Sequence, residues 1–388
     1  MKILLIHTYY VHRGGEDIVF EQERDLLNEG NEIETVSFRN RSGWKGIMQF
    51  FFSLWNISAA RKVRKYIVDF QPDIVHIHNW HFATGPLIIR EAKKCGVKVI
   101  VTLHNYRLLC PSATLVFNGR GFEDSVCANF PWKAIFIGAY RNSICLTFWL
   151  AVVIWVHRRI KTWNLVDRYV VLTEASKEVF VSSSLNVPSS KYIVKPNCTV
   201  DLAAKDLATR ECRFLYVGRL SEEKGIFVLL EAFSKVNLQL DLVGDGPLKN
   251  HVTSFCNNRV NVRYLGPLNT FDVRKQMRVC SALIFPSIWN ETFGLVLIEA
   301  LSVGCPVIAS NIGSVPEIIK DGVAGLLFSP GNVDSLIEKI ENWSDMSDGL
   351  RNSYCQNARH SYESNFTPEK NLKKLLKIYQ SVLPHSDR

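Results

Sequence analysis

The chain has 388 residues, of which 47% are hydrophobic and 21% are charged, and it carries a formal net charge of +9. This length suits two domains of ordinary size, and this composition excludes a wholly disordered chain. The positive charge favours anionic partners such as nucleotide phosphates, nucleic acid or an acidic membrane surface, without selecting one of them. The ten cysteines form no CxxC pair and no zinc-like cluster, which predicts free thiols in a reducing compartment.

The first residues, MKILLIHTYY, read as a strand and lack the apolar core and cleavage site of a secretory signal. We therefore expect a cytoplasmic protein. Along the first half of the chain, short apolar strands alternate with helices. Strands are predicted at residues 2–7, 33–38, 73–78, 97–104 and 167–172, with helices at 17–28 and 87–94.

The same alternation restarts in the second half. Strands are predicted at 212–217, 239–243, 260–264, 281–285, 306–309 and 325–328, with helices at 225–233, from 293 onward and at 367–383. Such alternation is typical of parallel sheets covered on both faces, and the stretch 194–207 between the halves has little periodicity. We predict two doubly wound α/β domains facing across a cleft, at 1–198 and 205–365, followed by a closing helix and tail at 366–388.

Two aromatic segments in the first half have basic neighbours. Residues 144–156 (ICLTFWLAVVIWV) contain no charge and precede HRRIK, and residues 48–55 (MQFFFSLW) are followed by RKVRK at 61–65. A bilayer span needs about 20 apolar residues, so the first segment does not favour a span. Both segments fit either a core helix with a solvated basic face or a helix lying on an anionic membrane surface.

The segment VGRLSEEKG at 217–225 places Arg219 and Lys224 five positions apart on a loop between a strand and a helix. Gly218 permits close approach of a ligand, and the helix that begins near Gly225 presents free backbone amides. This arrangement suits a diphosphate, because charge-assisted hydrogen bonds to phosphate are strong. The alternative is a solvated loop whose two cations are neighbours by chance.

The segment NETFGLVLIEA at 290–300 contains two carboxylates, Glu291 and Glu299, eight positions apart. Because helical residues rotate by about 100° each, this spacing brings the two to within about 80° of one side. Carboxylates accept hydrogen bonds from sugar hydroxyls, and the amides of Gly294 and Leu295 would face an anion. The alternative places Glu299 on the surface, but its apolar neighbours make an idle carboxylate there costly.

Histidines end two of the predicted strands. His104 closes VTLH, and His76 and His78 close DIVHIH. A histidine in this position can exchange a proton with a substrate hydroxyl, although a buried structural role is the alternative. His76 and His78 share a face, but the sequence shows no third ligand for a metal. Gly14 and Gly15 lie in the first strand-to-helix turn, where they fit either a plain turn or close approach to a ligand.

Together these residues resemble the retaining nucleotide-sugar glycosyltransferases of family four, which have the GT-B fold. The resemblance covers essentially the whole chain and rests on the order and spacing of its motifs. These are RGGE at 13–16, His104, Arg219 with Lys224, LVGDGP at 242–247, FPS at 285–287, Glu291 with Glu299, GCPVIAS at 304–310 and DGVAG at 321–325. One departure is Cys198, which follows Pro196 and Asn197 at the predicted hinge, where the family usually has glycine.

The resemblance implies a role for each of these residues. The donor diphosphate would be held by Arg219 and Lys224, the ribose by Glu299 and the transferred sugar by Glu291. Backbone amides would come from Phe293, Gly294 and Leu295, and Gly15 would approach the phosphates or the acceptor. His104 would lie beside the sugar, and the acceptor side would include Gly14, His78 and Glu174. The residues expected to carry catalysis are His104, Glu291, Arg219 and Lys224.

The resemblance also implies the reaction. A sugar would pass from a nucleotide-diphosphate sugar to a glycan or lipid-linked acceptor, with retained anomeric configuration and with the closing helix crossing back to the first domain. The loop at 105–127 is similar to members that build bacterial surface polysaccharides such as O-antigen or capsule. The sequence has no DxD-type motif, so we expect no metal and no cofactor besides the donor. We also expect peripheral contact with the anionic inner face of the plasma membrane.

Two other classes of function compete with this one. A nucleotide-sugar epimerase or hydrolase of the same fold would turn over the donor without an acceptor. A nucleic-acid binder would account for the positive charge, but the carboxylates Glu291 and Glu299 do not suit a phosphate backbone. We therefore expect no nucleic-acid partner.

Overall fold

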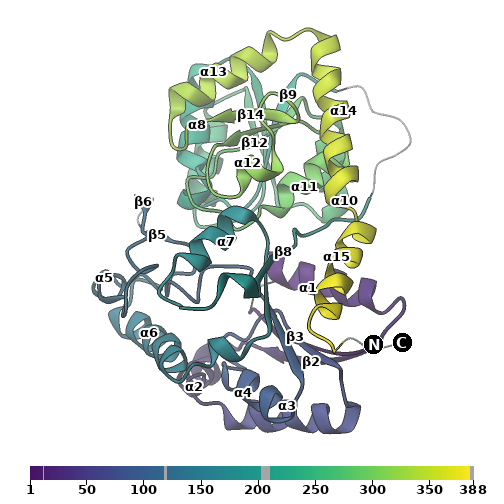
Figure 1. The fold of residues 1–388 in the computed structure, drawn as a ribbon. Coiled ribbons are helices and arrows are strands. Elements are labelled where there is room, and N and C mark those ends of the chain that lie inside the picture. The colour runs from purple at the N-terminus through teal and green to yellow at the C-terminus, as the bar shows by residue number, and fades with distance from the viewer. Residues whose placement is uncertain (12, 118–119, 202–209, 385–388) are drawn as a thin grey trace. The chain divides into compact units, whose positions relative to one another are not determined.

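The computed structural model describes residues 1–11, 13–117, 120–201 and 210–384 (Figure 1). The chain divides into two compact units. The first comprises Met1–Leu115, Phe122–Pro196 and Glu369–Arg388, and the second comprises Val116–Gly121 and Asn197–Pro368. The division after Pro196 lies two residues before the end of the predicted first domain, and much of the predicted linker falls at 202–209, outside the described residues.

The first unit is built on a six-stranded parallel sheet with the order β2-β1-β3-β4-β7-β8. Its strands are β1 (Lys2–Tyr9), β2 (Glu32–Arg39), β3 (Ile74–Ile77), β4 (Lys98–Thr102), β7 (Arg168–Val171) and β8 (Tyr192–Val194). Its helices are α1 (Gly15–Leu27), α2 (Gly43–Phe52), α3 (Ile57–Phe70), α4 (Leu87–Lys94), α5 (Trp132–Phe136), α6 (Ile144–Arg159), α7 (Glu174–Val181) and α15 (Pro368–Gln380). The sequence analysis missed β8, because a three-residue strand is too short to show a period.

Different helices cover the two faces of this sheet. On one face, Val99 of β4 belongs to the same core as Val63 of α3 and Ile88 of α4. On the other face, Leu5 of β1 shares a core with α1 and with Tyr379 of α15. The C-terminal helix therefore crosses back to the first unit, as the resemblance implied.

The second unit repeats this plan with the strand order β11-β10-β9-β12-β13-β14, again all parallel. Its strands are β9 (Arg213–Val217), β10 (Gln239–Val243), β11 (Val262–Gly266), β12 (Ala282–Phe285), β13 (Val307–Ser310) and β14 (Gly325–Phe328). Its helices are α8 (Ile226–Lys235), α9 (Lys249–Asn257), α10 (Thr270–Val279), α11 (Leu295–Ser302), α12 (Val315–Ile318), α13 (Val333–Ser344) and α14 (Asp348–Asn365). The predicted doubly wound α/β architecture is thus confirmed in both units.

Shorter elements complete the described chain. They are the antiparallel pair β5 (Val116–Phe117) and β6 (Arg120–Gly121), and the 3₁₀ turns Trp163–Leu165, Ser189–Lys191 and Glu222–Lys224. The last of these turns lies in the loop after β9 and carries Lys224.

Each sheet has a point at which the strand order reverses, beside β1 in the first unit and beside β9 in the second. In doubly wound sheets, ligands bind at such points, outside the carboxyl ends of the strands. In the first unit this edge carries Gly14 after β1 and His78 after β3. In the second unit it carries Lys224 after β9 and Glu291 after β12. The topology therefore brings predicted site residues to the reversal point of each sheet.

The apolar run at 144–156 forms most of α6. Leu150, Ala151 and Val153 are buried, whereas Ile144 and Phe148 are 54% and 42% exposed. Among the helices in the described part of the chain, none is both long enough and apolar enough to cross a bilayer. One side of α6 is therefore core, and apolar side chains remain on its outer side.

Candidate functional site

In the second unit, Lys224 and Glu291 meet at the carboxyl ends of β9 and β12. Their side chains form an ion pair. The Lys224 ammonium also lies 4.9 Å from the centre of the Trp289 ring, which adds a cation–π contact. Glu291 is only 6% exposed, so this pair is largely shielded from solvent. The structure thus brings together two residues that the sequence analysis placed in one site.

Three donors converge on a single oxygen of Glu291. Besides Lys224, Glu291 Oε1 accepts hydrogen bonds from Trp289 Nε1 at 2.7 Å and from Ser287 Oγ at 3.2 Å. In the sequence, Ser287 stands out only as part of the FPS motif, and Trp289 belongs to no motif. Their proximity to Glu291 along the chain was the one available signal. These contacts hold the carboxylate in one orientation.

The backbone of Gly225 allows Lys224 to reach this place. Gly225 has a φ of 74°, in the left-handed region that favours glycine. A Cβ atom at this position would lie 1.8 Å from the carbonyl oxygen of Pro286. Only glycine therefore lets the loop after β9 lie so close to the loop after β12.

The helix that follows Glu291 begins later than predicted. It runs Leu295–Ser302, and Gly294 before it has a φ of 89°. Because this left-handed residue interrupts the helical rotation, the expected alignment of Glu291 and Glu299 along one helix does not occur. Glu299 is half-buried in α11. Burial raises the pKa of Glu299, and the Arg274 guanidinium opposes that rise.

The other residues predicted to bind the donor differ in how much of their side chain solvent can reach. Arg219 is exposed on the loop after β9. Phe293 is 2% exposed, its ring packs 6.1 Å from that of Phe366, and its carbonyl accepts a hydrogen bond from Ser314 Oγ at 3.1 Å. Phe293 is therefore a packing residue, and only its backbone is available to a ligand. Gly294 and Leu295 form the amino end of α11.

In the first unit, His78 and His104 line one pocket at the carboxyl edge of the sheet. His78 Nδ1 lies 3.3 Å from His104 Nε2. Burial lowers the pKa of His104 to about 3, and it also lowers the pKa of His78 well below its usual range. Both rings are therefore neutral at pH 7, which suits hydrogen bonding to a hydroxyl better than donation of a proton.

The remaining predicted acceptor residues do not line this pocket. Gly14 caps α1, and its backbone N–H donates to Asp17 Oδ2 at 2.9 Å. Gly15 is the first residue of the same helix. Glu174 begins α7 and forms an ion pair with Lys177 at 3.3 Å. Their predicted contacts with phosphates or acceptor stay predictions.

A buried polar network lies behind His78. His78 Nε2 is 3.6 Å from Glu23 Oε2, and Glu23 forms an ion pair with the fully buried Lys195. Lys195 also donates a hydrogen bond to Asn371 Oδ1 of α15 at 3.1 Å. The sequence analysis missed Glu23 and Lys195 as functional candidates, since a charged residue shows no sign of its burial in the sequence.

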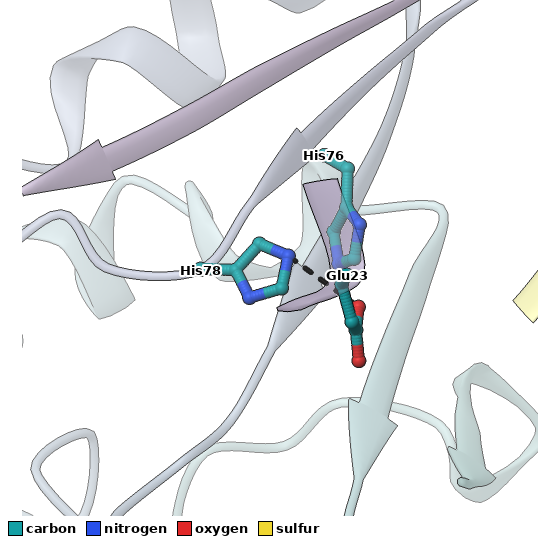
Figure 2. A group of neighbouring side chains, drawn as sticks. All are labelled: Glu23, His76 and His78. Atoms are coloured by element: carbon teal, nitrogen blue, oxygen red, sulfur yellow. Dashed lines mark ion pairs between the residues drawn. The ribbon is translucent and has the colours of Figure 1, made fainter. Parts of the chain in front are cut away.

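Glu23, His76 and His78 together could hold a metal ion, because their ligand atoms lie within 4.8 Å of one another (Figure 2). Glu23 supplies a third ligand that the sequence did not reveal, since it comes from α1. Two observations oppose a cation here. His76 Nδ1 and Nε2 already lie 2.7 Å from Tyr379 Oη and 2.8 Å from Thr102 Oγ1. The Lys195 ammonium also forms an ion pair with Glu23 Oε1, so the charge of this carboxylate is already balanced. The cluster is therefore described as a polar network.

Comparison with known proteins places the chain among enzymes. The family model described as "Glycosyl transferases group 1" matches residues 200–361, and the model "Glycosyltransferase Family 4" matches residues 13–201. An uncharacterized glycosyltransferase of Methanocaldococcus jannaschii is 32% identical over 400 residues, covering 98% of this chain and 99% of that protein. O-antigen chain mannosyltransferase C of Escherichia coli is 31% identical over 175 residues, covering 44% of this chain and 47% of that protein.

Solved structures agree at the level of the fold. A glycosyltransferase from Rickettsia africae superposes with a TM-score of 0.70 at 19% identity, covering 99% of this chain and 100% of that chain. The Anabaena protein HepE in complex with UDP also has a TM-score of 0.70, at 16% identity, covering 98% of this chain and 100% of that chain.

Proposed function

Since this chain belongs to the glycosyltransferases that these two family models describe, and has their GT-B fold, we propose that it transfers a sugar from a nucleotide-diphosphate sugar with retained anomeric configuration. The acceptor is a glycan or a lipid-linked glycan, and the product enters a bacterial surface polysaccharide such as O-antigen or capsule. The E. coli relative named for the O-antigen chain supports this context, and the UDP complex of HepE supports a nucleotide donor.

The observation that carries the proposal is the convergence of Lys224 and Glu291 at the reversal point of the second sheet. When the sugar–phosphate bond breaks, negative charge develops on the leaving diphosphate. Preorganised cations at that position lower the barrier, and Lys224 and Arg219 lie on the same loop after β9. We propose that these cations and the amides of Gly294 and Leu295 replace a metal ion.

The carboxylates and the histidine would orient the sugars. Glu291, held by Ser287 and Trp289, would accept hydrogen bonds from hydroxyls of the transferred sugar. Glu299 would do the same for the ribose of the donor. His104, neutral because burial lowers its pKa to about 3, would exchange a hydrogen bond with a sugar hydroxyl.

The test replaces the two central charges. Lys224→Met and Glu291→Gln should each lower the rate of sugar transfer about 100-fold, the usual effect of removing one electrostatic contact to a transition state. The control is Lys235→Met, because Lys235 is half-exposed in the same unit and pairs with Glu231.

Thermal unfolding in the presence of UDP, GDP or ADP would first identify the base of the donor, since a ligand that binds the native state raises Tm.

Two outcomes would contradict the proposal. One is wild-type transfer in both folded variants, which would remove Lys224 and Glu291 from the mechanism. The other is full-rate turnover of the donor in the absence of any acceptor, which would indicate an epimerase or a hydrolase instead.

We further propose that the enzyme works on the cytoplasmic side of a membrane. Its first unit has an aromatic surface, which we define as Trp44, Phe51, Phe52, Trp55, Trp132 and Phe136, each between 46% and 71% exposed. Phe51 of α2 contacts Trp149 of α6 with ring centres 5.4 Å apart, so these helices pack together. Lys45, the exposed neighbour of Trp44 in the sequence, adds a positive charge, and exposed aromatic rings next to a cation suit an anionic lipid surface.

A further inference from the structure

The pocket that contains His78 and His104 also contains an arginine with unmet hydrogen-bonding capacity. The pocket is narrow and partly open to solvent. Its polar lining comprises Glu16, His78, His81, His104, Asn105 and Arg107, together with the neighbouring Asn79 and Thr102. The Nε and Nη1 atoms of Arg107 are buried and have no hydrogen-bond partner among the described residues. A buried, unmet guanidinium N–H is costly, which points to a ligand that accepts from it.

The other charged group in this pocket is Glu16, which has its own hydrogen-bond donors; burial raises its pKa, and the nearby Arg107 charge opposes that rise. Glu16 Oε2 accepts a hydrogen bond from Tyr10 Oη at 2.9 Å, and Glu16 Oε1 accepts one from Asn105 Nδ2 at 2.5 Å. His78, His81 and the ring of His104 are neutral, because burial lowers the pKa of each. Arg107 is therefore the one charged side chain of the described pocket lining with unused donors, and it favours an anionic group.

Two aromatic rings hold the guanidinium in place. Its central carbon lies 5.8 Å from the centre of the Phe82 ring and 5.7 Å from that of Tyr140. Such stacking fixes the plane of the guanidinium without using its N–H groups, which leaves them to a planar or tetrahedral oxyanion.

The same two rings connect Arg107 to the aromatic surface. Phe82 and Tyr140 both pack on Phe50 of α2, with ring centres 5.2 Å and 6.3 Å apart. Phe50 is buried, whereas the next two residues, Phe51 and Phe52, are 50% and 58% exposed and belong to the aromatic surface. The inner side of α2 therefore packs against the two rings that hold Arg107, and its outer side presents apolar rings.

We propose that Arg107 binds the phosphate group of a lipid-borne acceptor in this pocket, while the aromatic surface receives the lipid chain. The proposal rests on the proposed function and adds the chemical class of the acceptor. His104, in the same pocket, would then face the first sugar hydroxyl next to that phosphate.

The experiment measures binding of the full chain to farnesyl phosphate in neutral phosphatidylcholine vesicles, with farnesol and methyl phosphate as separate probes. Arg107→Gln should bind farnesyl phosphate at least about tenfold more weakly than wild type, since it loses a charge-assisted, two-donor contact. The affinity of Arg107→Lys for farnesyl phosphate should lie between those of wild type and Arg107→Gln. The matched control is Arg141→Gln, because Arg141 is exposed and stacks on the same Tyr140 ring at 5.4 Å without lining the pocket. Farnesol binding should be equal in all variants.

The proposal is overturned if folded Arg107→Gln binds farnesyl phosphate as wild type does, or if Arg141→Gln loses as much. Equal affinity for methyl phosphate would overturn the assignment of a lipid-borne ligand. Because these measurements need no sugar transfer, they remain informative if no nucleotide sugar is turned over, an outcome that would count only against the proposed function.

Discussion

Three histidines at the carboxyl edge of the first sheet illustrate what single residues contribute. His76, His78 and His104 are all buried, and burial lowers the pKa of each. His78 Nδ1 forms a hydrogen bond with His104 Nε2 at 3.3 Å, whereas His78 Nε2 lies 3.6 Å from Glu23 Oε2, too far for a hydrogen bond. The sequence predicted that these histidines lie at the ends of strands. Their neutral state follows from burial, which only the folded structure shows.

We expect the protein to lose stability as the pH falls from about 6.5 towards 3. Histidines of the unfolded chain take up protons near pH 6.5, whereas folded His104 does so only near its pKa of about 3. Protons therefore favour the unfolded state, by up to about 1.4 kcal/mol per pH unit and histidine. Tm measured from pH 7 to pH 5 should fall less steeply in His76→Gln than in wild type. A wild-type slope in His76→Gln would contradict the assignment.

At the scale of elements, Lys195 joins parts of the first unit that are distant along the chain. It directly follows β8 and contacts Glu23 of α1 and Asn371 of α15. Asn371 Nδ2 also donates to the carbonyl of Pro196 at 2.7 Å. The position of α15 on the sheet thus depends on polar contacts as well as on the apolar core around Tyr379.

Breaking this buried pair should be costly. Lys195→Met and Glu23→Gln should each destabilise the protein by about 3–5 kcal/mol, because each leaves a buried partner uncompensated. The double variant should lose clearly less than the sum, since it removes both charges. Urea unfolding of all four proteins measures this difference, and strict additivity would rule out the coupling. The half-exposed pair Lys235 and Glu231 serves as a control and should contribute less than about 1 kcal/mol.

At the scale of the whole molecule, the proposed membrane contact combines the net charge of +9 with the aromatic surface. Under this proposal, cationic side chains attract the protein to an anionic bilayer, and apolar rings then enter the interface. The sequence predicted aromatic segments with basic neighbours but left a core helix as the alternative. Only folding showed that α2 and α6 each bury one side and expose apolar residues on the other.

Co-sedimentation with vesicles tests this surface. Binding to vesicles containing phosphatidylserine should weaken as salt rises, because salt screens the attraction between charges. Replacing Trp44 and Phe52 together by serine should reduce binding at least about tenfold, since a fully buried ring contributes roughly 1.5–3 kcal/mol and about 1.4 kcal/mol already corresponds to tenfold. Phe271→Ser is the matched control, because Phe271 is 73% exposed in the second unit. A membrane-binding role would be refuted if the Trp44/Phe52 variant and Phe271→Ser lost the same amount of vesicle binding. It would also be refuted if the wild-type protein did not bind the vesicles.

The sequence by itself determined the architecture, the order of strands and helices, and the segments that carry the candidate site. These features depend on local periodicity and on glycine-containing loops between strands and helices, which the chain displays without folding. Only the tertiary structure decided that Lys224 pairs with Glu291, 67 positions away, and that Glu23, Lys195 and Arg107 are withdrawn from water. Pairing and desolvation arise when sheet topology brings distant loops to one edge, and no local pattern encodes that meeting.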